Sequence, residues 1–119
     1  MKIKLLLGGS SSERDVSISS GLSVYNAIKS DLDVELVYLD DNYIETLSEL
    51  NLNNSIFFNA LHGGYGENGE LQSYLEQFNI PFTGSNSEAC RIAMSKNSTK
   101  IIAKEASIST ALWSMDINN

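Results

Sequence analysis

Residues 3–9 read IKLLLGG, a short apolar run that is broken only by Lys4 and ends in two glycines. Such a run is typical of a strand buried in a parallel sheet, and the glycine pair indicates a tight turn directly after it. The serines at positions 10–12 offer hydroxyls that can cap a helix, and apolar residues then recur at helical spacing from Ile18 to Ile28. The stretch therefore predicts a buried strand, a turn and a helix.

The rest of the chain repeats this alternation of strand and helix. The expected strands are 34–39, 56–61 and 80–84, and the expected helices are a weak one at 43–50 and stronger ones at 71–78, 85–94 and 97–106. Alternating strands and helices favour a parallel sheet that is covered on two sides. We therefore expect an α/β fold, a Rossmann-like open parallel sheet of about four strands with helices on both faces. We expect one domain.

Composition limits the classes of partner. The chain has 119 residues and a formal net charge of −7 from 8 basic and 15 acidic side chains, which argues against a nucleic acid or an anionic membrane. Its one cysteine, Cys90, cannot form an internal disulfide, and no Cys/His cluster indicates a metal site. The first apolar run is too short for a signal peptide, and no stretch reaches the roughly 18 apolar residues of a membrane span. We therefore expect a cytoplasmic protein.

Two loops combine glycines with chemically useful side chains, and both follow expected strands. They are residues 8–17 (GGSSSERDVS) and 62–72 (HGGYGENGELQ). Ligands bind beyond the carboxyl ends of the strands in open parallel sheets, where glycines let backbone amides approach a ligand. Glu13 lies at an expected helix start, where a carboxylate is stabilised and could hold a ligand ammonium group. The first loop could be a phosphate cradle, but it lacks both the G-x-G-x-x-G and the G-x-x-x-x-G-K-[ST] pattern, and it is not a nucleophile elbow because no G-x-S-x-G occurs.

Each of these residues also has a structural explanation. Glu13 could simply improve the start of its helix, and His62, the only histidine, could be a satisfied structural residue. Glu67 and Glu70 lie near the next helix start and are more readily explained by capping. Cys90 lies among small and apolar neighbours, which favours packing over thiol reactivity. A receiver-type regulatory domain is excluded because the acidic residues that it needs after the first and third strands are absent.

Taken together, the two loops resemble signatures of D-alanine–D-alanine ligases. Residues 7–17 (LGGSSSERDVS) are similar to the amino-terminal signature of that family, and residues 60–72 (ALHGGYGENGELQ) are similar to its second signature. Residues 81–85 (PFTGS), 94–96 (MSK) and 99–100 (TK) follow in the family's order and at its spacing. The resemblance extends from Ile3 to about Trp113.

This resemblance implies an enzyme that joins two D-alanines for peptidoglycan precursor synthesis, with ATP and Mg²⁺ as cofactors. It implies that residues 1–113 are the amino-terminal substrate-binding domain and that 114–119 begin a linker to an ATP-grasp region. The ATP-grasp domains are absent from this sequence, so we expect the chain alone to bind neither cofactor and to be inactive. The implied partners are D-alanine, the missing ATP-grasp domains and a second copy of the chain.

The resemblance also implies roles for individual residues. Glu13 would anchor the ammonium group of the first D-alanine, and His62 would help to place its carboxylate, so these two are the catalytic candidates. The full set of candidates comprises Glu13, His62, Gly9, Ser10, Gly63 and Gly64 for substrate binding and Lys96 on the nucleotide side. A free-standing module that binds a small molecule or another protein without catalysis is the alternative function.

Overall fold

The computed structural model describes residues 1–112. Along the chain its elements are β1 (Lys2–Gly8), α1 (Arg14–Ile28), β2 (Asp33–Leu39), α2 (Tyr43–Ser48), β3 (Ser55–Asn59), the 3-10 helix η1 (Gly64–Gly66), α3 (Glu70–Gln77), α4 (Ser87–Ala93) and α5 (Lys96–Glu105). No helix in this part of the chain is long and apolar enough to cross a membrane. The expected boundary at Trp113 and the expected linker at 114–119 lie outside the described residues.

The sheet has the parallel pairing that the apolar run predicts. Its strand order is β2-β1-β3, and both neighbours run parallel to β1. Leu5 pairs with Leu36 on one side and with Phe58 on the other. The first strand of the chain is therefore the central strand of the sheet, which explains why Leu5, Leu6 and Leu7 are completely buried.

The expectation of a fourth strand has to be corrected. Within residues 1–112 the sheet has three strands, and the segment expected at 80–84 forms only a single parallel bridge, between Phe57 and Phe82. The amide of Phe57 donates to the carbonyl of Pro81, and the amide of Thr83 donates to the carbonyl of Phe57. Proline has no N–H to extend the pairing backwards, and Gly84, at φ 99°, turns the chain away after Thr83.

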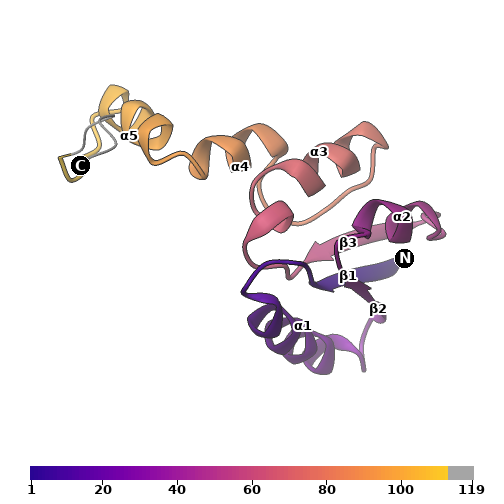
Figure 1. The fold of residues 1–119 in the computed structure, drawn as a ribbon. Helices are drawn as coiled ribbons and strands as arrows, with labels where there is room; N and C mark the ends of the chain where they lie inside the picture. Colours follow the sequence, from indigo (N-terminus) through magenta and orange to yellow (C-terminus); the bar gives the residue numbers. More distant parts are fainter. Residues whose placement is uncertain (113–119) are drawn as a thin grey trace.

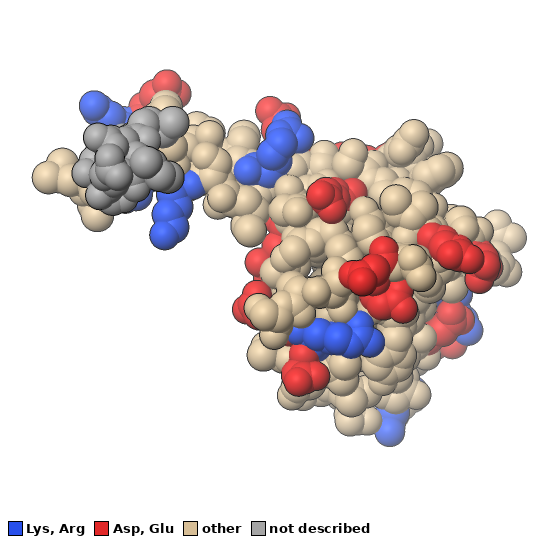
Figure 2. Space-filling view, in the orientation of Figure 1, with Lys and Arg blue, Asp and Glu red and all other residues tan. Residues whose placement is uncertain are grey.

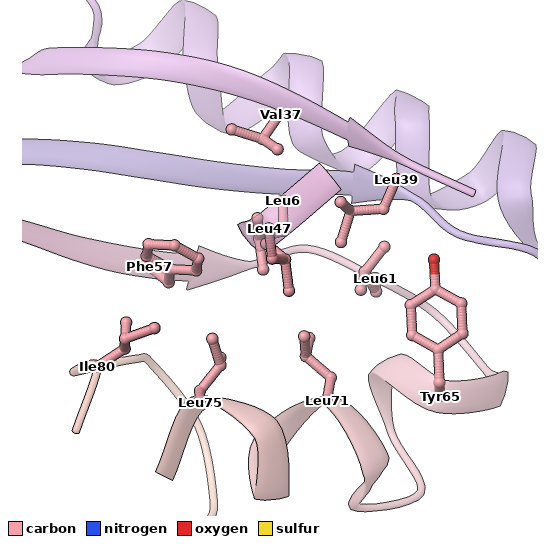
Figure 3. Close-up of a cluster of buried hydrophobic side chains, with 10 residues drawn as sticks. All are labelled: Leu6, Val37, Leu39, Leu47, Phe57, Leu61, Tyr65, Leu71, Leu75 and Ile80. Atoms are coloured by element: carbon pink, nitrogen blue, oxygen red, sulfur yellow. The ribbon is translucent and has the colours of Figure 1, made fainter. Parts of the chain in front are cut away.

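Helices cover both faces of the sheet, as expected (Figure 1). Side chains alternate along β1, so Leu5 and Leu7 face α1 in one apolar cluster, whereas Leu6 joins the cluster on the opposite face. That second cluster is filled by α2 and α3 (Figure 3) and comprises Leu6, Val37, Leu39, Leu47, Phe57, Leu61, Tyr65, Leu71, Leu75 and Ile80.

Helix α1 lies very close to the central strand. A Cβ atom placed on Gly21 would lie 2.8 Å from the Cβ of Leu7, so only glycine allows this approach. Ser17, one turn earlier on the same helix, is also completely buried. The helix therefore contacts the sheet through small residues, which brings its amino terminus close to the carboxyl end of β1.

The chain leaves the body of the molecule after residue 85. We call residues 1–85 the body and residues 86–112 the arm. In Figure 1, α4 and α5 extend away from the sheet, and the molecule measures 47 × 28 × 28 Å. The side chain of Asn86 caps α4, and that of Ser95 caps α5 by accepting from the amide of Ser98. The two helices expected near 85–94 and 97–106 are thus confirmed.

Candidate functional site

The two glycine-containing loops meet beyond the carboxyl ends of β1 and β3. The hydroxyl of Ser11 donates to the carbonyl of His62 at 2.6 Å and accepts from the amide of Glu13 at 3.1 Å. The sequence suggests a capping role for the serines at 10–12, but α1 has Glu13 at its N-cap and no side-chain cap. Ser11 instead joins the two loops.

The carboxylate of Glu13 lies against the second loop. A Cβ atom placed on Gly63 would lie 2.6 Å from Oε2 of Glu13 and 3.0 Å from Oγ of Ser11. Gly63 also has φ 70°, a backbone conformation that favours glycine. Any side chain at this position would therefore displace the Glu13 carboxylate. The structure thus brings Glu13 and the His62–Gly63 turn together from distant parts of the sequence.

The imidazole of His62 is held from the side of α1. Its Nε2 atom lies 3.2 Å from the hydroxyl oxygen of Ser20, and the residue is half-buried. The carbonyl of the same residue accepts from Ser11. Contacts from the first loop and from α1 therefore fix the position of His62.

Ser17 and Arg14 connect the site to the strand ends, and neither was singled out from the sequence. The buried hydroxyl of Ser17 accepts from the amide of Gly8 at 2.9 Å and donates to the carbonyl of Ala60 at 2.8 Å. It thereby links the ends of β1 and β3. The guanidinium of Arg14 donates to the carbonyls of Gly9 and Leu39, each at 2.6 Å, which links β1 to β2.

Tyr65 is a further residue that sequence reasoning missed. Its hydroxyl donates to the carbonyl of Asp40 at 2.7 Å, and its ring stacks on Tyr43 with the centroids 4.0 Å apart. Burial, with a smaller contribution from the charge of Asp40, raises the pKa of Tyr65 to about 12. The phenol therefore stays protonated and anchors the second loop to the end of β2.

The remaining predicted site residues, Gly9, Ser10, Gly64 and Lys96, differ in burial and in distance from the two loops. Gly9 is buried beside Leu61, whereas Ser10 and Gly64 are exposed at the rim of the two loops. Lys96 is the first residue of α5, and α5 extends away from the loops that carry Glu13 and His62 (Figure 1). Lysine and arginine side chains lie along this arm in Figure 2.

A hollow of about 260 Å³ lies beside the second loop, at the base of the arm. It is lined by Asn59, Leu61, Gly66, Glu67, Gln72, Thr83, Gly84, Ser85 and Cys90, and thus by neither Glu13 nor His62. Burial raises the pKa of the Cys90 thiol, which opposes formation of a reactive thiolate. Glu70 lies in the first turn of α3, but that helix has no side-chain cap.

The described residues offer no group of three or more His, Cys, Asp or Glu side chains that could hold a metal ion. The site is instead a polar junction of two loops, at which the Glu13 carboxylate and the His62 imidazole lie near backbone turns that contain glycine. Such a junction is suited to binding a small polar molecule that carries a positive charge.

Comparisons with known proteins point to one family, and the region that matches its model includes the second loop. Residues 42–85 match the family described as "D-ala D-ala ligase N-terminus". A D-alanine–D-alanine ligase of Glaesserella parasuis is 42% identical over 111 residues, which are 92% of this chain and 36% of that protein. A related ligase of Aquifex aeolicus is 38% identical over 95% of this chain and 38% of its own length. The chain thus spans a little over a third of these relatives.

Solved structures of such ligases have the same fold. The ligase of Bacillus anthracis superposes with a TM-score of 0.82 and 34% identity, over 96% of this chain and 37% of that one. The same enzyme complexed with ATP superposes with a TM-score of 0.73 and 36% identity. On this evidence, the chain belongs to the D-alanine–D-alanine ligase family, in which it corresponds to the amino-terminal part.

Proposed function

We propose that this chain is the part of an ATP-dependent ligase that binds the first of two D-alanines, which are joined for peptidoglycan precursors in the cytoplasm. The observation that carries the proposal is the contact between the Glu13 carboxylate and the His62–Gly63 turn. D-Alanine carries an ammonium and a carboxylate group a few bonds apart. A site for it therefore needs an anion and a hydrogen-bond donor held close together.

In this proposal Glu13 accepts hydrogen bonds from the ammonium group of D-alanine. His62 presents its ring near the substrate carboxylate, while Ser11 and Ser20 hold it in place. Gly9, Gly63 and Gly64 shape the wall of the site without side chains that would fill it, and the exposed Ser10 lies at its rim. Charge-assisted hydrogen bonds of this kind are stronger than those between neutral groups, so Glu13 contributes most of the binding energy.

The residues present do not fit ATP or Mg²⁺. The described residues hold no cluster of carboxylates for the metal, and neither glycine loop has a lysine placed for phosphate binding. Phosphoryl transfer depends on such cationic groups around the phosphates. We therefore propose that the rest of a ligase supplies both cofactor sites, that Lys96 contributes from the arm, and that the 119-residue chain alone is inactive.

A chimera tests the proposal. Residues 1–112 are fused to the part of the Glaesserella parasuis ligase that follows the matched region, and D-alanine saturation is measured by phosphate release. Glu13→Gln should raise the KM for the first D-alanine about 5- to 150-fold, the equivalent of roughly 1–3 kcal/mol for a charged hydrogen bond. Asp15→Asn, an exposed carboxylate two residues further along, is the control. An unchanged KM for Glu13→Gln would reject the role of Glu13.

An interaction module without catalysis is the second candidate, and the exposed apolar residues of the arm favour it. The intact mass of the protein in its native cells distinguishes the two. A mass well above 13.1 kDa, large enough for two more domains, supports the ligase. A native mass of 13.1 kDa would exclude ligase chemistry by this chain on its own.

A further inference from the structure

We propose that Ser20 is a positioning residue that selects the tautomer of His62, so that Nδ1 carries the proton and donates a hydrogen bond to the carboxylate of D-alanine. His62 faces that carboxylate only under the proposed function, on which this inference therefore rests. The new elements are the atom through which His62 binds and the residue that determines this choice.

The two nitrogen atoms of the His62 ring have different surroundings. Nε2 lies 3.2 Å from the hydroxyl oxygen of Ser20, on α1. Within residues 1–112, Nδ1 has no hydrogen-bond partner. A neutral imidazole has one N–H donor and one bare nitrogen that accepts. The partner of Nε2 therefore decides whether Nδ1 offers a proton or a lone pair to a ligand.

The hydroxyl of Ser20 is placed to donate to Nε2. A serine inside a helix often donates to a carbonyl three or four residues before it, and its oxygen then serves other groups as an acceptor. In the part of the chain that the structure describes, the hydroxyl of Ser20 makes no such bond, and His62 is its one partner. Because Ser20 is half-buried, its hydroxyl proton is best satisfied by the bare Nε2. The proton of the neutral ring then lies on Nδ1.

Nδ1 is also the ring nitrogen closer to the main chain of its own residue. The hydroxyl of Ser11 holds that main chain, because it donates to the carbonyl of His62 at 2.6 Å. The next residue, Gly63, borders the Glu13 carboxylate, since a Cβ atom placed on it would lie 2.6 Å from Oε2. An N–H at Nδ1 therefore belongs to the part of the ring next to the turn that borders Glu13. D-Alanine carries its ammonium and carboxylate groups on one carbon, so it needs a donor and an acceptor in such proximity.

The opposite tautomer would oppose the same substrate. With the proton on Nε2, the bare Nδ1 would present a lone pair to a carboxylate, and two acceptors repel each other. A neutral imidazole in water favours the Nε2–H form, so the protein has to supply a hydrogen bond that reverses this preference. The hydroxyl of Ser20 supplies it. Ser20 thus acts through His62 and does not touch the substrate.

The tautomer is measurable because the chain contains one histidine. The 119-residue chain is labelled with ¹⁵N, and the two ring nitrogens are followed by NMR to the alkaline plateau of the titration, where a bare nitrogen resonates far downfield of an N–H. In the wild type Nε2 should be the downfield nitrogen, and in Ser20→Ala the two signals should move towards exchanged positions. Ser20→Thr keeps the hydroxyl and should retain the wild-type spectrum. Ser19→Ala, an exposed position on the same helix, is the matched control.

A second measurement connects the tautomer to the substrate. In the chimera described above, Ser20→Ala should raise the KM for the first D-alanine about 3- to 10-fold, the size expected when one hydrogen bond is weakened. Ser20→Thr should restore the KM, and Ser19→Ala should leave it unchanged.

Three results would overturn the inference. They are a wild-type spectrum in which Nε2 carries the proton, a Ser20→Ala spectrum equal to that of the wild type, and a changed tautomer with an unchanged KM. The wild-type spectrum needs no variant, so it tests the tautomer even if Ser20→Ala does not fold. The spectra are recorded on the chain without substrate, so this failure is distinct from a failure of the proposed function, which an unchanged KM in Glu13→Gln would show.

Discussion

Ser17→Ala should destabilise the chain far more than the loss of one oxygen atom suggests. The hydroxyl is completely buried and bridges the amide of Gly8 and the carbonyl of Ala60. Alanine would leave both backbone groups buried without this partner. An unsatisfied buried group costs roughly 1–3 kcal/mol, and alanine regains only a few tenths as the better helix former. The expected loss in the free energy of unfolding is therefore about 2–4 kcal/mol.

Urea unfolding monitored by far-ultraviolet circular dichroism measures this loss directly. At about 4 °C per kcal/mol, the value between those of smaller and larger domains, the melting temperature should fall by roughly 8–16 °C. Ser19→Ala is the matched control, because Ser19 lies on the same helix and is exposed. Its effect should stay within about 0.5 kcal/mol. Equal unfolding midpoints for the two variants would refute the bridging role of Ser17.

Three further perturbations test other contacts. The pKa of Tyr65 is raised to about 12 from 10.0. The protonated Tyr65 hydroxyl therefore stabilises the folded chain fully below pH 10, and this stabilisation is lost as the pH rises towards 12. The urea midpoints of the wild type and of Tyr65→Phe should converge over that range. Gly21→Ala should destabilise the fold by about 1–3 kcal/mol, because its Cβ would lie 2.8 Å from that of Leu7; an unchanged melting temperature would show that the helix can shift freely. Hydrogen bonds from Ser87 lower the pKa of Glu76 below 4.5. The protection of the Ser87 amide, measured as its exchange rate relative to the intrinsic rate at each pH, should therefore fall as the pH falls through that lowered pKa. In Glu76→Gln the protection should not change with pH over this range.

The fold was largely predictable because its central strand is an apolar run that is broken only by Lys4. Residues 5–7 are completely buried, so leucines cover both faces of the strand and the apolar pattern is easy to recognise. The prediction of a fourth strand was wrong for a local reason. Phe82 does pair with Phe57, but Pro81 and the turn at Gly84 limit that pairing to one bridge. Apolar character predicted the contact but not its length.

The candidate site was predictable only in part. The glycine turns and Glu13 stand out in the sequence, and the structure brings them together. The hydroxyls of Ser11 and Ser17 do not stand out, because the sequence alone does not indicate whether a serine caps its own helix or donates to a distant carbonyl. Their partners, His62 and Ala60, are set by the pairing of β1 with β3. Residue roles that depend on such pairing become visible only in three dimensions.

The strand order has a consequence for how the protein is made. The central strand is the first of the three strands to leave the ribosome, and both of its neighbours are synthesised after it. Its pairing with β3, in which Lys2 lies opposite Ser55, can form only after residues 55–59 have been made. During that interval Leu5, Leu6 and Leu7 are exposed on a nascent chain with both edges unpaired. Pairing of such distant segments is slow compared with the closure of local turns. The amino terminus is therefore the segment for which a molecular chaperone has the longest opportunity to bind.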